Sequence, residues 1–143
     1  MADADSGLIA TGIGRVSRQA TIQARNPIEK TLARGQITNA TTTLYTAPAA
    51  PTVANSVGLN PVTRITEIWL CNTDTATRTV TVYVVESGGS AADNRAILKD
   101  ATIAAKTSYR IPCETTLEAS ATVQAVADTT LKVSYLLSGF EFT

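Results

Sequence analysis

Histidine, the residue that most often carries acid-base and metal chemistry, is absent from the 143 residues of this chain. Its absence removes the Ser-His and Cys-His pairs that activate a nucleophile, together with the most common metal ligand. The carboxylates are scattered, and sheet residues such as Glu67 and Glu86 are more simply solvated side chains than members of a glycosidase pair. The sequence therefore predicts a protein that is not an enzyme and has no catalytic residues.

Two short patterns come close to a ligand-binding signature without completing one. Gly12-Ile13-Gly14-Arg15 has no strand before it, no third glycine and no Lys-Ser or Lys-Thr pair, so it does not match a phosphate-binding loop. Cys71 and Cys113 have neither a CxxC spacing nor a histidine-rich neighbourhood. They allow a single bridge or two buried thiols, and the frequent burial of free cysteine favours the second. We expect no metal and no cofactor.

Charge is balanced over the whole chain but not along it. The formal net charge is zero, which gives no overall basic field for nucleic acid or for an anionic membrane. The first 40 residues have five basic and three acidic side chains, and the remainder has seven and nine. The basic five are Arg15, Arg18, Arg25, Lys30 and Arg34. Because they are few and no aromatic residues lie between them, we expect a solvated segment or one bound to an acidic protein partner.

Length and composition favour one domain built from strands. A chain of 143 residues supports a single core, and threonine, alanine and valine dominate over the bulky residues that pack helices. No apolar run is long enough to span a bilayer, and the acidic start MADADSG is unlike a secretory signal. We therefore expect an all-β protein that is not held in a membrane.

Two β-rich runs separated by a polar turn give the clearest strand signal. The second run alternates Val80 and Val82 with threonine and tyrosine, the period of a strand with one buried face. The first run alternates Ile68 and Leu70 with polar and aromatic residues. A five-residue loop between them, residues 73–77, predicts a β-hairpin that places Leu70 opposite Val80 and Ile68 opposite Val82.

Aromatic residues fall on the faces that this pattern turns away from the core. Trp69 and Tyr83 share the outer face of the predicted hairpin, where they are either half covered by neighbouring side chains or a second sheet, or make an intermolecular contact. The last run, residues 131–142, is apolar on both faces. Its inward residues are Leu131, Val133, Tyr135 and Leu137, and those of opposite parity are Leu136, Phe140 and Phe142. This strand is either central and covered on both sides, or its end contacts another subunit.

Residues 1–40 lack the alternation of the remainder and form a predicted N-terminal arm. Apolar residues at helical spacing, from Ile9 to Ala20, are interrupted by two glycines. A better helix signal is Asn26-Pro27-Ile28-Glu29, with Asn26 as N-cap, Pro27 in the first turn and Gly35 placed to end the helix after Arg34. So short a helix is unstable alone and must dock on its own domain or on a neighbour.

From residue 41 to residue 143 the pattern is that of a β-sandwich. Short strand-like runs alternate with turn residues, beginning with the TTLYT run at residues 42–46 and resuming after the Pro-rich loop that ends near Pro61. Even spacing of this kind is typical of a sandwich or jelly roll. The predicted architecture is an antiparallel, jelly-roll-like β-sandwich with an extended arm that holds at most a short helix.

The order of these elements resembles a family of small virion proteins of tailed bacteriophages, over about two-thirds of the chain. The residues that carry the resemblance are Thr43 to Pro48, Ile65 to Asn72, Val80 to Val85 with Ser87-Gly88-Gly89-Ser90, Asn94-Arg95, Thr102 to Ala105, Leu117 to Ala119 and Val123 to Ala125. The resemblance implies a β-sandwich that decorates the head, attaches at the collar or neck, or forms the base of a fibre. The arm is an addition that it does not explain.

The resulting hypothesis is a non-enzymatic structural protein located in the virion, oligomeric as a trimer or ring and anchored by its arm to a major capsid, neck or fibre protein. The interface residues expected in the arm are Ile9, Ile13, Arg15, Arg18, Arg25, Ile28, Leu32 and Arg34, and those expected in the domain are Trp69, Tyr83, Phe140 and Phe142. The alternative is a carbohydrate-binding module for the host surface, or a tail or fibre adaptor, because sandwiches of this size also bind glycans through exposed aromatic residues.

Overall fold

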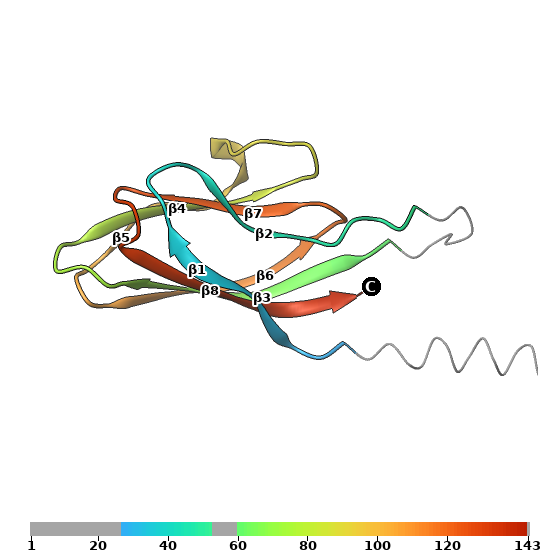
Figure 1. Ribbon diagram of the computed structural model, residues 1–143, viewed down its shortest axis with the longest axis horizontal. Coiled ribbons are helices and arrows are strands. Elements are labelled where there is room, and N and C mark those ends of the chain that lie inside the picture. Colours follow the sequence, from blue (N-terminus) through green and yellow to red (C-terminus); the bar gives the residue numbers. More distant parts are fainter. Residues whose placement is uncertain (1–26, 53–59, 143) are drawn as a thin grey trace, which may run out of the picture.

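The computed structural model describes residues 27–52 and 60–142, which form two four-stranded antiparallel sheets packed face to face (Figure 1). Sheet A has the strand order β1-β8-β3-β6 and sheet B the order β2-β7-β4-β5, the arrangement of an eight-stranded jelly roll. In chain order the strands are β1 (Lys30–Ile37), β2 (Thr42–Thr46), β3 (Val62–Asn72), β4 (Arg78–Val85), β5 (Ala96–Ile103), β6 (Ser108–Leu117), β7 (Thr122–Ala127) and β8 (Val133–Phe142), with a 3₁₀ turn η1 (Asp93–Arg95). The predicted all-β sandwich is confirmed.

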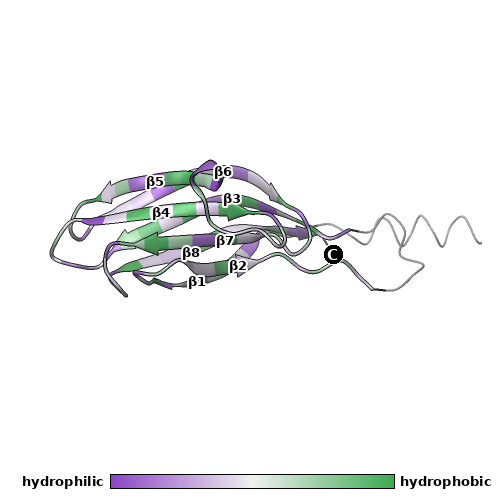
Figure 2. Ribbon diagram, turned by 90° about the horizontal axis from the view of Figure 1, so that it is seen from above, coloured by the Kyte–Doolittle hydropathy of each residue, from purple (hydrophilic) through white to green (hydrophobic). Residues whose placement is uncertain are grey.

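The core lies between the two sheets and is made of small and branched apolar side chains. Apolar and polar residues alternate along most strands, as the colours of Figure 2 show. Fully buried members include Ile65, Ile68, Leu70, Val80, Val82, Val123, Val133 and Leu137. Burial of each such side chain contributes about 1.5–3 kcal/mol. The threonine- and valine-rich composition thus builds a thin core shared by both sheets.

The predicted hairpin between β3 and β4 is wrong, because the two strands belong to different sheets. β3 pairs with β6 and β8, and β4 pairs with β5 and β7. Residues 73–77 therefore cross from sheet A to sheet B. Ile68, Leu70, Val80 and Val82 are all buried as predicted, but they face one core from opposite sides. The alternation of apolar and polar residues shows which face of a strand is buried. It does not show which strand lies beside it.

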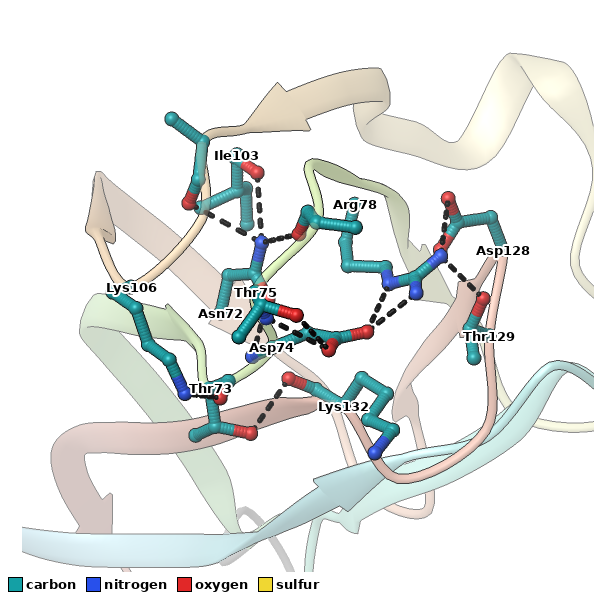
Figure 3. Close-up of polar contacts among 12 residues, drawn as sticks. Asn72, Thr73, Asp74, Thr75, Arg78, Ile103, Lys106, Asp128, Thr129 and Lys132 are labelled. Carbon is teal, nitrogen blue, oxygen red and sulfur yellow. Dashed lines mark hydrogen bonds and ion pairs between the residues drawn. The ribbon is translucent and has the colours of Figure 1, made fainter.

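A polar cluster fixes this crossing at one end of the sandwich (Figure 3). Asn72 is fully buried, and its side-chain amide donates to the carbonyls of Ala76 at 2.8 Å, Ile103 at 3.0 Å and Ala104 at 3.2 Å. Its side-chain oxygen accepts the backbone N–H of Asp74 at 2.9 Å. One amide therefore ties the crossing loop to the turn between β5 and β6.

Arg78 completes the cluster from the first position of β4. Its guanidinium donates to the Asp74 carboxylate, with Nε to Oδ2 at 2.9 Å, and to the Thr129 hydroxyl at 2.8 Å. Asp128 lies 3.8 Å from the same guanidinium. The Arg78 hydrogen bonds, followed by that from the Thr75 backbone N–H, lower the pKa of Asp74. The loop between β7 and β8 is thus joined to the crossing by one side chain.

The helix predicted from Asn26 to Arg34 is not formed where the structure describes the chain. Residues 30–37 form strand β1, which pairs with β8 from Lys30 opposite Gly139 to Ile37 opposite Val133. The backbone hydrogen bonds of β8 and the burial of Ile37 override the capping signal. Asn26 lies outside the described residues. This part of the predicted arm is a strand of sheet A, while a division of the chain at residue 40 stays a prediction.

The last predicted run forms the interior strand β8, between β1 and β3, but it is not covered on both sides, because Phe142 at its end is 43% exposed. Val133 and Leu137 are fully buried and Tyr135 packs against the core, as predicted. Leu131 is an exception, because it precedes the strand in a left-handed conformation and is half exposed. Cys71 and Cys113 are free thiols, with Cys113 buried and Cys71 half-buried.

All four edge strands deviate from regular pairing. The register shifts occur at Thr31/Ala33 in β1, at Thr43/Tyr45 in β2, twice where β5 pairs with β4, and where β6 pairs with β3. Bulges of this kind twist an edge away from a straight ladder and discourage another strand from adding to it. Contacts with other molecules are therefore favoured through the faces of the sheets.

Candidate interaction surface

The outer face of sheet A is where the structure brings three predicted interface residues together. On β3 Trp69 points away from the core, and it pairs with Leu136 of β8 on one side and Arg110 of β6 on the other. Further along β8, the same parity places Phe140 and Phe142 on this face. Trp69 is 39% exposed and Phe142 is 43% exposed, while Leu136 and Phe140 are half-buried. We call these four apolar residues the aromatic strip.

The indole of Trp69 is held in position by two charged neighbours. Its Nε1 donates to Glu67 Oε1 at 2.6 Å, and Arg110 Nε donates to Glu67 Oε2 at 2.6 Å. The Arg110 guanidinium carbon lies 5.7 Å from the centroid of the indole ring, within cation–π range. The indole, the large apolar surface at one end of the strip, is therefore fixed before any partner arrives.

Charge on this face is paired locally. The hydrogen bond from Trp69, and then that from Arg110, lower the pKa of Glu67, so this carboxylate stays ionised at neutral pH. Next to Phe140 in the ladder is Arg64, which forms an ion pair with Glu114 of β6 at 3.0 Å. Both pairs are exposed and contribute little to folding. They flank the strip with polar groups, as the rim of a protein contact does.

The chain enters sheet A across the same face. Glu29, just before β1, accepts a hydrogen bond from the Thr66 hydroxyl at 2.7 Å. Thr66 is at the bulge of β3, and its hydroxyl is also 3.1 Å from the Ser138 carbonyl of β8. The Glu29 side chain therefore reaches from the β1 side over β8 to β3. Ile28 is 81% exposed beside it.

A second polar cluster lies on the inner side of this corner. Tyr45 of β2 donates to Glu141 Oε1 at 2.5 Å, and its hydroxyl is 3.1 Å from that of the buried Thr63. Glu141 also pairs with Lys30 at the start of β1. Burial, followed by the Glu141 hydrogen bond, raises the pKa of Tyr45 to about 12. These contacts link sheet B to sheet A where the N-terminal segment joins the sandwich.

The remaining predicted interface residues are dispersed. Tyr83 is on the outer face of sheet B, paired with Gln124, so it does not join Trp69. Leu32 is half-buried and packs against the core, whereas Arg34 is exposed on β1. Five lie outside the described residues: Ile9, Ile13, Arg15, Arg18 and Arg25. Sequence reasoning missed Arg110 and Glu67 as neighbours of Trp69, because cross-strand register leaves no local signal.

The outer face of sheet B is more polar. Val85 is fully buried although its parity points outward, because the loop before η1 covers it; a Cβ on Gly89 would lie 3.0 Å from the Val85 side chain. Elsewhere Thr79, Thr81, Asp100 and Asp128 line a shallow hollow. Thr81 and Asp100 bond each other there, with the Asp100 N–H donating to the Thr81 hydroxyl at 3.0 Å. Val126 and Ala127 complete its lining, so this hollow offers apolar surface as well as hydroxyl and carboxylate groups.

Among residues 27–52 and 60–142, no three His, Cys, Asp or Glu side chains are grouped so that they could hold a metal ion. The same residues include no helix of the length and apolarity needed to cross a membrane.

No family model matches the sequence, and no curated protein matches it. Among solved structures, a chain of the infectious bursal disease virus Gx strain is similar, with 17% identity and a TM-score of 0.45. A chain of the infectious bursal disease virus VP2 subviral particle has 15% identity and a TM-score of 0.44. Each match covers 81% of this chain and 31% of the other, so this chain spans about a third of their length.

Proposed function

We propose that this protein is a non-enzymatic structural component of a tailed-phage virion, which decorates or cements the head or its neck or collar. The observation that carries the proposal is the aromatic strip, an exposed apolar surface on a sandwich whose edges are all irregular. Such a surface marks a site of contact with another protein. The jelly roll is a common fold of viral capsid domains, and the sequence resemblance to small phage virion proteins points the same way.

The face of sheet A supplies the contact between subunits in this proposal, and the N-terminal segment supplies the anchor. We define the N-terminal segment as residues 1–26. It contains Arg15, Arg18 and Arg25 with apolar residues between them, and it precedes Glu29, which bonds Thr66 of β3. The partner is a second copy of this chain in a trimer or ring, and the anchor binds an acidic surface of a major capsid, neck or fibre protein.

The test is incorporation into particles. Deletion must stop at residue 26, because residues 30–37 form β1 and a longer deletion would remove a strand of sheet A. We expect the shortened protein to keep its thermal unfolding transition and to be lost from purified particles. Replacement of Arg15, Arg18 and Arg25 by glutamine tests the charge separately. Normal incorporation of the shortened protein would overturn the anchoring role.

A carbohydrate-binding module is the second candidate, because jelly rolls also occur in lectins and Trp69 is an exposed aromatic beside charged hydrogen-bonding groups. One contact opposes it, since the Arg110 guanidinium already lies over the indole ring where a sugar would stack. Glycan binding that disappears in Trp69→Ala and strengthens in Arg110→Ala would favour this candidate over the first. Binding that is absent from the native protein would remove it.

A further inference from the structure

The hollow on the outer face of sheet B lies on the side of the sandwich opposite the aromatic strip. Three adjacent strands, β7, β4 and β5, bring its lining residues together. Thr81 pairs with Val126 on one side, and a bulge of β5 brings Asp100 to its other side. The volume of the hollow is about 210 Å³. Pockets for drug-sized ligands measure roughly 300–1,000 Å³, so this hollow has room for one small group or one side chain.

A buried hydroxyl holds one carboxylate in place at the hollow. Thr81 is buried, and its hydroxyl accepts the Asp100 backbone N–H at 3.0 Å and donates to Asp100 Oδ1 at 3.2 Å. The Asp100 backbone has a φ of 48°, in the left-handed region that aspartate and asparagine tolerate. A bulge of this kind re-aims a side chain. The contacts with Thr81 occupy one oxygen of Asp100, and Oδ2 is the oxygen left for a ligand.

The charge of the hollow is negative and only partly neutralised. Arg78 Nη1 lies 3.8 Å from Asp128, but the same guanidinium is closer to Asp74, with Nε 2.9 Å from Oδ2 (Figure 3). One cation is therefore shared by two carboxylates. Within the described part of the chain, Asp100 forms no ion pair. A positively charged group is therefore the ligand that complements this site.

We propose that the hollow is a receptor for a lysine side chain of a different protein. The ammonium group binds the Asp100 and Asp128 carboxylates, with the Thr79 hydroxyl as a further acceptor, and the aliphatic stem lies on Val126. Lysine fits better than arginine because its ammonium is compact and has three donors. The planar guanidinium prefers both oxygens of one carboxylate, and Thr81 already occupies one oxygen of Asp100.

A second copy of this chain is a poorer source of the lysine. Most basic side chains of the described residues already form ion pairs within their own subunit. These are Lys30, Arg64, Arg78, Arg95, Lys99 and Arg110. A lysine on another protein has no such competing partner within this fold.

The inference goes beyond the proposed function, because it concerns the opposite face and does not depend on the virion role. It gives the subunit two unlike contacts, an apolar one on sheet A and an electrostatic one on sheet B. One exposed ion pair contributes little affinity. Its effect is on orientation, since paired charges fix the register of two surfaces.

The test uses the full chain and small probes, followed by amide chemical shifts. N-acetyl-lysine amide is the probe, and N-acetyl-norleucine amide is its control, with the same hydrocarbon stem and no ammonium group. Methyl glucoside represents a sugar. We expect saturable shifts with the lysine probe at Thr81, Asp100, Val126 and Asp128, and none with the norleucine probe. Affinity should fall as ionic strength rises.

Asp100→Asn is the decisive variant. Asparagine tolerates the left-handed backbone and keeps a side-chain oxygen for the Thr81 hydroxyl, so the fold should be unchanged. The affinity for the lysine probe should fall about fivefold. Glu114→Gln is the matched control, because it removes one exposed carboxylate from sheet A and should leave the affinity unchanged.

Three results overturn the proposal. The first is equal affinity of the native protein and Asp100→Asn for the lysine probe, or an equal response to the norleucine probe. The second is a set of shifts at the same residues with methyl glucoside and none with the lysine probe, which assigns the hollow to a sugar. The third is salt-dependent self-association of the native chain that Asp100→Asn abolishes, which makes the occupant a second copy.

Discussion

The polar end around Asn72 and the outer face of sheet A both contain hydrogen-bonded charged side chains, but these side chains have different roles in the two regions. At the polar end, Asn72, Asp74 and Arg78 find their partners within the fold, and three connections are joined by them. On the face, Glu67 and Arg110 also bond each other, but their effect is to hold Trp69 in an exposed position. The residues at the polar end have all their described partners within the fold. The residues around Trp69 leave apolar surface exposed that another molecule could cover.

This difference distinguishes residues that stabilise the sandwich from residues that contact other molecules. Substitutions at the polar end and at close backbone contacts should lower stability without changing the face. Substitutions on the strip should change association with little effect on folding. The experiments below test that separation, starting with the largest expected effect.

Gly139→Ala should have the largest effect on folding. A Cβ at this position would lie 2.1 Å from the Arg64 carbonyl oxygen, which belongs to the backbone of β3 and cannot turn aside. We expect a loss of more than about 3 kcal/mol, or failure to fold, in urea unfolding. Gly35→Ala is the control, because its Cβ would meet the Tyr135 side chain at 3.1 Å and that ring can shift. Equal effects of the two variants would refute the close approach as the cause.

Asn72→Ala should rank next. It removes three donated bonds and one accepted bond from a fully buried position, leaving the carbonyl of Ile103 without its partner. The expected loss is about 2–3 kcal/mol by chemical unfolding, with Trp69 fluorescence of the folded state unchanged. Asn94→Ala, at an exposed position of η1, should be nearly neutral. A fluorescence change in folded Asn72→Ala would show that the two regions are coupled.

Tyr45→Phe should act mainly at high pH. The pKa of Tyr45 is raised to about 12 in the folded state, so its contribution to stability is intact below its ordinary value near pH 10 and is lost as pH rises toward 12. The variant should lose about 1 kcal/mol at neutral pH through the missing hydrogen bond to Glu141. It should also show a weaker loss of stability between pH 10 and about pH 12, measured by denaturant unfolding. An unchanged alkaline slope would contradict this origin.

Arg78→Met should alter the acid limb of the stability profile. The pKa of Asp74 is lowered by Arg78, so its contribution is present above the ordinary carboxyl value and is lost as pH falls through the lowered one. Without Arg78 the protein should melt at a lower temperature at neutral pH and lose less stability on acidification. Lys99→Met removes an exposed ion pair with Asp93 and serves as the comparison. Parallel acid profiles for native protein and Arg78→Met would refute the assignment.

Trp69→Ser should have the smallest effect on folding. It removes one hydrogen bond to Glu67 and the contact with Arg110 at an exposed site, so unfolding should change by less than about 1 kcal/mol. Association with particles or between subunits should fall nonetheless. A stability loss as large as that of Asn72→Ala would place Trp69 among the structural residues and remove the contrast between the two regions.

The sequence predicted which residues are buried better than it predicted which strands lie side by side. Alternation correctly identified the buried faces of β3, β4 and most of β8, because burial has a period that local composition records. The partners of β3 could not be predicted, since any strand with one apolar face satisfies the same pattern. The signal at Asn26 to Arg34 failed for a related reason: strand β8, which converts residues 30–37 to β1, lies about 100 residues later in the sequence.

The site was predictable to a similar extent. Trp69, Phe140 and Phe142 could be recognised as outward-facing from parity alone, and they do share one face. The assignment of Tyr83 to that face depended on the hairpin and failed with it. Glu29 and Thr66 gave no signal, because their contact requires a bulge and three strands brought together from distant parts of the chain.

The pairing of β1 with β8 also sets the order of events during synthesis. Because Lys30 pairs with Gly139, sheet A cannot be completed until β8 has been synthesised, long after β1. Until then β1 has an unpaired edge, which is the kind of transiently exposed surface that makes a folding chain prone to aggregation.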